Sequence, residues 1–311
     1  MSVPSILRTA ARNFLPPGRG SSRLRCRALS SCSNTRKMSS KRQMDHLEKT
    51  SKDYRQNTVY PAQVCGIIQE SDTVKRLRVS VHPDFTFKAG QWVDFFIPGV
   101  EKVGGFSMCS CPGLLQREGV IELAVKKALH PPANWIHTAC TVGAHVGMRV
   151  GGNFFFDPRP ADPPADLLLV AGGVGINPLY SILLHAAHLA RQHHASGGRD
   201  YRMGSAHMLY SAKSVQELLF KNTIVDLSRE FPGQFSCDLR VTEPSQDPAR
   251  DQSILPVTRR GRITEEDLRA HVDPQRTLCY LCGPPPMIEA ISQSLIDLGL
   301  PKDRILFEKW W

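Results

Sequence analysis

The first 44 residues contain no aspartate or glutamate, although they hold eight Arg and two Lys. Asp45 is the first carboxylate, and beyond residue 44 the 29 basic side chains match the 29 acidic ones. The formal charge of +10 therefore belongs to the N-terminal segment, and the rest of the chain is near neutral. A near-neutral body lacks the broad basic surface that binds nucleic-acid phosphates, so we expect no nucleic-acid partner.

Two further features are missing. No stretch approaches eighteen unbroken apolar residues, which argues against a transmembrane segment. The nine cysteines are odd in number and irregularly spaced, so they do not form a disulfide framework. Cys279 and Cys282 lie three apart in a strand and face opposite ways, while Cys109 and Cys111 have no neighbouring histidine. Neither pair indicates zinc, and we expect no metal site.

The segment 1–44 is rich in Arg and Ser, and Arg8 and Arg12 share one helical face. The apolar residues of another face are Ile6, Leu7, Ala10 and Phe14. This pattern is typical of a mitochondrial transit peptide, with a disordered basic tail as the alternative. We therefore expect a mitochondrial protein with a targeting segment at 1–44 and a linker at 45–57.

Residues 58–160 are predicted to form a barrel domain. Apolar residues recur at every second position in short strands such as 76–82 and 120–127, separated by Gly and Pro turns. This spacing favours a closed antiparallel barrel. Four prolines within 157–166 then indicate an interdomain linker.

Residues 161–311 alternate between strand and helix patterns, which predicts a parallel sheet. Ser214 with Glu217, and Thr264 with Asp267, have the spacing of capping boxes at two helix starts. Gly299 is expected to close the last helix. The five expected strands are 167–171, 206–211, 235–242, 277–283 and 304–311.

A glycine cluster follows the first of these strands, in the sequence LLLVAGGVGINPL. Gly172, Gly173 and Gly175 allow positive φ and close approach of a ligand, and the following helix N-terminus attracts phosphate. Asn177 and Pro178 are expected at the N-cap and the first helical position, with the helix running to about Arg191. The alternative is a tight strand-to-helix connection that binds nothing.

The order of a barrel, VAGGVGINPL, YLCGPPPM and a terminal aromatic strand resembles the ferredoxin-NADP reductase superfamily, which includes cytochrome b5 reductase. The resemblance covers about 58–311. It implies a two-domain β plus α/β fold, in which an N-terminal antiparallel β-barrel of the flavin-reductase type precedes a parallel-sheet nicotinamide-nucleotide-binding domain.

The resemblance also implies a nucleotide site, with NAD as the cofactor and NADP as the alternative because Ser211 and Lys213 follow the second strand. Cys282 would lie near the nicotinamide, or would simply be a small buried residue. The expected cofactor-binding residues are Gly172, Gly173, Val174, Gly175, Ile176, Asn177, Pro178, Gly283 and Pro284.

For FAD, the resemblance implies that the Phe106 ring stacks on the flavin and that the Ser107 hydroxyl contacts it. Gly104 stands where relatives carry an arginine that holds the cofactor phosphate, and a glycine does not replace a guanidinium. The cationic side chains that remain to compensate are Lys126, Lys127 and Arg149, with solvated surface charges as the alternative.

The implied reaction is hydride transfer from NADH to flavin, followed by electron transfer to a separate acceptor: a haem protein, a ferredoxin, a quinone or a small molecule. Ser107, Cys282 and Glu308 are the expected catalytic residues, with Glu308 supplying protons or else pairing with Lys309 at the surface. Trp310 or Trp311 would shield the flavin or close the core. The alternative function is a nucleotide sensor or scaffold that has lost flavin and catalysis.

Overall fold

The computed structural model describes residues 45–243 and 254–309. They belong to one compact unit of the chain. The expected targeting segment at 1–44 and the expected shielding residues Trp310 and Trp311 lie outside the described residues.

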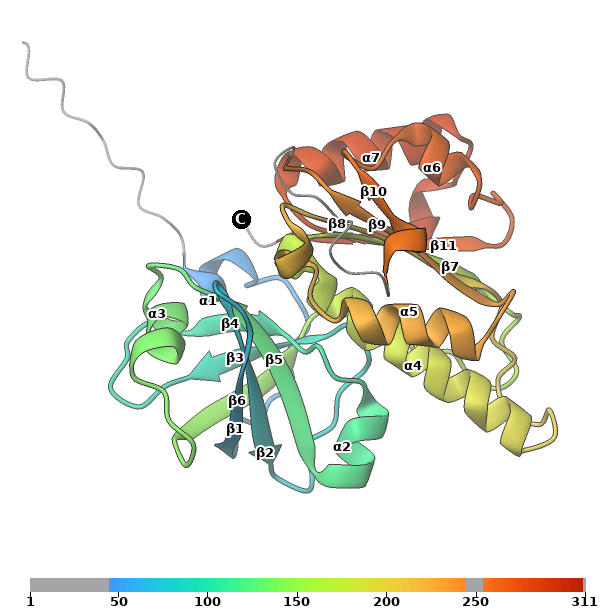
Figure 1. The fold of residues 1–311 in the computed structure, drawn as a ribbon. Coiled ribbons are helices and arrows are strands. Elements are labelled where there is room, and N and C mark those ends of the chain that lie inside the picture. Colours follow the sequence, from blue (N-terminus) through green and yellow to red (C-terminus); the bar gives the residue numbers. More distant parts are fainter. Residues whose placement is uncertain (1–44, 244–253, 310–311) are drawn as a thin grey trace, which may run out of the picture. The chain divides into compact units, whose positions relative to one another are not determined.

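The first sheet is six-stranded and antiparallel, with the strand order β4-β3-β6-β1-β2-β5 (Figure 1). Cys109, just after β4, donates its amide to the carbonyl of Glu122 in β5 at 2.9 Å, so the two edges approach each other there. Two short helices, α2 (Pro112–Glu118) and α3 (Pro131–Thr138), interrupt the strands. The strands are β1 (Tyr60–Ser71), β2 (Val74–Val81), β3 (Trp92–Phe96), β4 (Gly104–Ser107), β5 (Val120–Lys126) and β6 (His145–Gly151).

The second sheet is parallel, with the order β10-β9-β8-β7-β11-β12. It has six strands where five were expected, because the short β10 (Thr258–Arg260) adds an edge that no sequence period signals. The other strands are β7 (Asp166–Gly172), β8 (Ala206–Ala212), β9 (Phe235–Val241), β11 (Thr277–Cys282) and β12 (Ile305–Glu308). The two sheets confirm the predicted barrel and parallel-sheet architecture.

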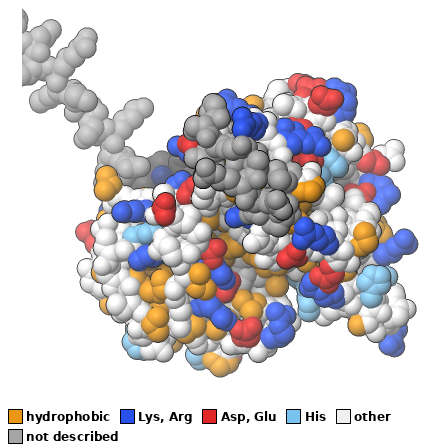
Figure 2. All heavy atoms as spheres, in the orientation of Figure 1, with side chains coloured by type: hydrophobic (Ala, Val, Ile, Leu, Met, Phe, Trp, Pro, Cys, Tyr) orange, Lys and Arg blue, Asp and Glu red, His pale blue; other side chains and the backbone are white. Residues whose placement is uncertain are grey.

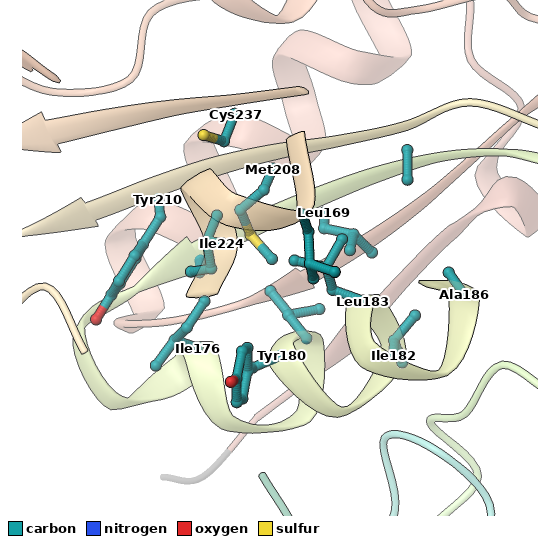
Figure 3. Close-up of a cluster of buried hydrophobic side chains, with 14 of the residues drawn as sticks. Leu169, Ile176, Tyr180, Ile182, Leu183, Ala186, Met208, Tyr210, Ile224 and Cys237 are labelled. Atoms are coloured by element: carbon teal, nitrogen blue, oxygen red, sulfur yellow. The ribbon is translucent and has the colours of Figure 1, made fainter. Parts of the chain in front are cut away.

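Helices cover both faces of the second sheet (Figure 1). Those on one face are α4 (Ile176–Ala195) and α5 (Lys221–Glu230), and those on the other are α6 (Glu265–Arg269) and α7 (Pro285–Asp297). Figure 3 shows Ile176, Tyr180 and Leu183 of α4 packed beneath Leu169 and Met208 of the sheet. Because both faces are covered, the central strand β7 is apolar from Leu167 to Ala171, as the sequence indicated.

Two predicted helix starts are wrong. The turn η1 (Gly173–Gly175) leads directly into α4, so Gly175 is the N-cap and Asn177 lies inside the helix. Ser214 and Glu217 flank the short turn η2 (Val215–Glu217), and α5 begins only after Phe220, which has a φ of 58°. In the second case the Glu217 side chain bonds to the barrel instead of capping a helix.

Two other helix ends follow the sequence. The capping box of Thr264 and Asp267 is confirmed at the start of α6. Gly299, with a φ of 88°, follows the C-cap of α7 at Leu298. These ends are specified by residues within one helical turn of each other, so local sequence is enough to predict them.

Residues 45–57, expected to be a linker, pack against the barrel. They begin with α1 (His46–Lys49), capped by Asp45, and Arg55 bridges to Gly151 of β6. The His46 ring meets the Trp92 ring edge-on at 4.8 Å between centroids. Buried side-chain contacts of this kind distinguish a structural segment from a spacer.

Acidic and basic side chains are interspersed on the face of the molecule drawn in Figure 2. This agrees with the near-neutral charge of the chain beyond residue 44. In the part of the chain that the structure describes, no helix is both long enough and apolar enough to span a bilayer.

Candidate functional site

The glycine turn after β7 packs directly against the end of β11. A Cβ on Gly175 would lie 2.4 Å from the carbonyl oxygen of Cys282, and a Cβ on Gly172 would lie 2.5 Å from Met287 Sδ. Gly283 also approaches Gly172, since a Cβ on Gly283 would be 3.1 Å from the Gly172 Cα. The turn is therefore bare partly because two loops must touch through their backbones.

Gly173 is different, because a Cβ there would meet no atom of residues 45–243 or 254–309 within 4 Å, and its φ is +55°. Beside it, Asn177 is 6% exposed and donates its amide to the Ala124 carbonyl of β5 at 2.7 Å. The side-chain oxygen of Asn177, Oδ1, is buried and has no hydrogen-bond partner among the residues that the structure describes. The open backbone at the start of a long helix suits an anionic group, and the unpaired buried acceptor suits a hydrogen-bond donor of the same ligand.

The other four expected nucleotide residues line or support the same turn. Val174 is partly buried in η1, while Ile176 and Pro178 are buried in the first turn of α4 and pack into the domain. Pro284 is the N-cap of α7, directly opposite the glycine turn. The parallel register of Cys282 with Ala171 brings the two loops to one sheet edge.

The three expected catalytic residues meet at the ends of three strands. Ser107 ends β4, Cys282 ends β11 and Glu308 ends β12, with Cys282 and Glu308 in register. Ser107 Oγ donates to Glu308 Oε2 at 3.1 Å, across 201 residues of sequence. The exposed fractions are 5% for Ser107, 1% for Cys282 and 8% for Glu308. The Glu308 carboxylate is therefore buried, whereas the alternative prediction placed it at the surface with Lys309.

Glu217 joins the second sheet to the barrel. Its carboxylate accepts hydrogen bonds from Ser71 and Thr73, each at 2.8 Å, and pairs with Lys126 at 3.3 Å. Burial raises the pKa of Glu217, but the hydrogen bonds from Thr73 and Ser71 and the charge of Lys126 outweigh burial and leave the pKa below its usual value. Lys126 therefore forms an ion pair with Glu217.

At the expected flavin-phosphate position, the structure leaves no space for a side chain. A Cβ on Gly104 would lie 2.6 Å from the Phe106 ring and 3.0 Å from Pro132 of α3. On the other side of the strand, a Cβ on Gly105 would meet the His46 ring at 2.2 Å. The space beside Gly104 and Gly105 is occupied by the Phe106 ring and by His46 of the segment 45–57.

Arg149, named above as a compensating cation, belongs to a buried charge cluster. Asp94 is fully buried and accepts hydrogen bonds from His46 Nε2 at 2.8 Å, Arg55 Nε at 3.0 Å and Arg149 Nε at 2.8 Å. Burial raises the pKa of Asp94, but the hydrogen bonds from His46, Arg149 and Arg55 hold it below the usual value of 3.8. Arg149 therefore neutralises a carboxylate and is not a solvated surface charge.

This cluster was missed in the sequence. Its one local signal is an aspartate in the otherwise apolar strand QWVDFFI, where an uncompensated charge is not expected. The partners of Asp94 come from 39 to 55 positions away, and no sequence period connects them.

Comparison with known proteins agrees with this geometry. Residues 169–293 match the family model described as "Oxidoreductase NAD-binding domain". The protein "Oxidoreductase NAD-binding domain-containing protein 1" of Danio rerio is 63% identical over 88% of this chain and 100% of its own length. The protein of the same name from Homo sapiens is 53% identical over 88% of this chain and 87% of its own length.

Solved structures share the fold at low sequence identity. A ferredoxin NADP+ reductase from Neisseria gonorrhoeae, with bound FAD and NADP, has a TM-score of 0.62 and 17% identity, covering 81% of this chain and 99% of its own. The cytochrome b5 reductase domain of Ulva prolifera nitrate reductase has a TM-score of 0.63 and 19% identity, covering 81% and 97%. The chain therefore belongs to the family of oxidoreductase NAD-binding domain-containing protein 1 and has the two-domain fold of the ferredoxin-NADP reductases.

Proposed function

We propose that this protein is an NAD(P)H oxidoreductase that transfers hydride from NADH to FAD, and then passes electrons to a separate acceptor. The observation that carries the proposal is the meeting of Ser107, Cys282 and Glu308 at one sheet edge, next to the glycine turn. These side chains come from both sheets, and a reaction between two cofactors needs groups from both domains. The acceptor we propose is a haem protein, a ferredoxin, a quinone or a small molecule.

The nucleotide side of the proposal is supported by the open Cβ position of Gly173 and by the unpaired Oδ1 of Asn177. A pyrophosphate would lie against the turn at the N-terminus of α4, and a ribose hydroxyl or a carboxamide would donate to Asn177. We propose NADH as the preferred nucleotide. We also propose the mitochondrion as the site of action, because residues 1–44 are rich in Arg and Ser and contain no acidic residue.

The flavin side fits in part. The Phe106 ring and the Ser107 hydroxyl are present, and both suit the ring end of a flavin. The phosphate end lacks the arginine of relatives, because Gly104 is blocked. Of the other candidate cations, Arg149 binds Asp94, Lys126 binds Glu217 and Lys127 is exposed. We therefore propose that FAD is held weakly and dissociates easily.

The roles of the side chains follow from their burial and contacts. A bound flavin would supply a two-electron acceptor that releases electrons singly or in pairs. Ser107 holds a proton at Oγ, which it donates to Glu308, and its hydroxyl oxygen would accept a hydrogen bond from a bound flavin. Glu308 supplies or receives that proton, and the near-complete burial of Ser107, Cys282 and Glu308 keeps bulk water from the reacting atoms.

A visible spectrum of the purified full-length protein tests this function. We expect a yellow protein that loses FAD during gel filtration, regains the colour when FAD is added, and is bleached by NADH without oxygen. A protein that stays colourless with added FAD and consumes no NADH would contradict the proposal.

Replacing Glu308 by glutamine is expected to lower the rate of NADH oxidation by about 10²-fold, since it removes the proton-transfer group and keeps its shape. The affinity for NADH should change little. Steady-state kinetics and calorimetry measure the two effects. Glu289→Gln, at an exposed position on α7, is the matched control and should leave both values unchanged. Equal rates for the Glu308 variant and the wild type would remove Glu308 from the mechanism.

The second candidate is a nucleotide sensor or scaffold without flavin. The blocked position of Gly104 and the packing of His46 against Gly105 favour it, because both fill the strand that would face a cofactor phosphate. A colourless protein that still binds NADH in calorimetry would support this function over the enzyme.

A further inference from the structure

Three metal-ligating side chains lie together on the face of the second sheet that α6 and α7 cover. His207 is in β8, Asp238 is in β9, and His271 follows α6. Each offers one ligand atom, and these three atoms lie within 4.8 Å of one another. His207 and Asp238 share a face with Leu209, which packs in the core under α7. His207 is at the start of its strand, whereas the glycine turn is at the carboxyl ends.

His207 carries the strongest sign of a ligand. It is 6% exposed, and its Nε2 is buried without a hydrogen-bond partner among the described residues. Its other nitrogen, Nδ1, lies 2.7 Å from Ser236 Oγ. When the Nδ1–H group of His207 donates a hydrogen bond to Ser236 Oγ, Nε2 carries a lone pair. Hydrogen-bond partners of metal-binding histidines commonly fix the ring in this tautomer. An unpaired buried nitrogen is costly, and a bound cation would relieve that cost.

Asp238 is close enough to share an ion with His207. Its Oδ2 is 3.5 Å from His207 Nε2, which is too far for a good hydrogen bond. Two ligand atoms that each lie about 2.1 Å from a tetrahedral Zn²⁺ are separated by about 3.4 Å. The second oxygen, Oδ1, is 3.8 Å from Arg259 Nε, so one oxygen of the carboxylate faces a cation and the other faces the histidine.

His271 completes the set. Its ring stacks on that of His207, with centroids 3.4 Å apart and an interplanar angle of 12°. In this stacked position the lone pairs of the two rings do not converge, so His271 must turn about its side-chain torsions to bind the same ion. It is only partly buried and lies in the turn after a five-residue helix, so the ring can turn without moving a strand.

We propose that His207, Asp238 and His271 bind one Zn²⁺ ion, with water as the fourth ligand. Two imidazoles and one carboxylate suit zinc, whereas Mg²⁺ and Ca²⁺ prefer oxygen ligands alone. The ion ties the turn after α6 to β8 and β9, and so stabilises the nucleotide-binding domain at a place remote from the glycine turn. Cysteine spacing cannot reveal this site, because its ligands are two histidines and an aspartate from three separate elements.

The test uses the full-length protein, treated with EDTA and dialysed, and then titrated with zinc sulfate in a calorimeter. We expect one equivalent to bind with micromolar or tighter affinity, and the melting temperature to rise. His271→Ala and Asp238→Asn should each weaken binding by at least about tenfold and remove the thermal shift. His194→Ala, at the exposed end of α4, is the matched control and should behave as the wild type.

Cobalt gives a second readout that does not depend on a variant folding. Co²⁺ bound to the wild-type protein should show the visible bands of a four-coordinate nitrogen and oxygen site, without the strong near-ultraviolet absorption of a cobalt thiolate. The proposal is overturned by a wild-type protein that does not bind Zn²⁺ saturably, by binding that survives both ligand substitutions, or by a thiolate spectrum.

Discussion

Replacing Gly175 by alanine is expected to weaken NADH binding by about ten- to hundredfold. The φ of Gly175 is −61°, so alanine is conformationally allowed, but its Cβ would lie 2.4 Å from the Cys282 carbonyl oxygen. The clashing atoms belong to the backbone of Cys282 and Gly283, so no side-chain rotation can remove the clash. The glycine turn must therefore move away from β11. Overpacking of this kind costs about 1–3 kcal/mol, which corresponds to that range of affinity.

Calorimetry with NADH measures the effect on the purified variant. Gly66→Ala is the matched control, because Gly66 also has no positive φ and a Cβ there would make only ordinary contacts, beginning at 3.4 Å from Arg78. The control should bind NADH as the wild type does. If Gly175→Ala binds NADH within twofold of the wild type while remaining folded, the turn is not the nucleotide site.

The second large effect is expected from Asp94→Asn, which should lower the free energy of unfolding at pH 7 by about 3–5 kcal/mol. The substitution keeps the size of the side chain but removes the charge that Arg55 and Arg149 share in a buried position. Loss of one partner from a buried ion pair leaves the other charges uncompensated. Urea unfolding followed by circular dichroism measures the difference.

The pH dependence gives an independent check. Because the folded protein holds the pKa of Asp94 below its usual value of 3.8, the carboxylate stabilises the protein above that value. This stabilisation is lost as the pH falls through the lower, folded pKa. The wild type should therefore approach the variant in stability at low pH.

Glu230→Ala is the control for the Asp94 substitution. Glu230 pairs with Arg191 at the surface, where both side chains are more than 40% exposed. An exposed pair is worth about 0–1 kcal/mol, so this variant should unfold close to the wild type. Equal losses for Asp94→Asn and Glu230→Ala would show that the buried cluster has no special role in stability.

Local patterns were enough to predict most of the secondary structure. Alternating residues such as Leu77 and Val79 identify a strand with one buried face, and the Thr264 capping box identifies the start of α6. The same reasoning failed at Ser214 and Glu217, which have capping-box spacing as well. There, the barrel offers Ser71 and Thr73 as partners for the Glu217 carboxylate, and these long-range bonds replace the local one.

The sequence by itself determined the alternation of the main strands and helices in the second sheet, although not the short β10. It also determined the near-neutral charge beyond residue 44 and the bare turn at 172–175. Each of these depends on residues close together in the chain, where period, charge and glycine content are directly readable. Only the tertiary structure decided that Ser107 meets Glu308, that Asp94 is surrounded by His46, Arg55 and Arg149, and that Gly175 touches Cys282. These contacts join elements far apart in sequence, because sheet pairing and domain packing, and not local propensity, fix which strand ends meet.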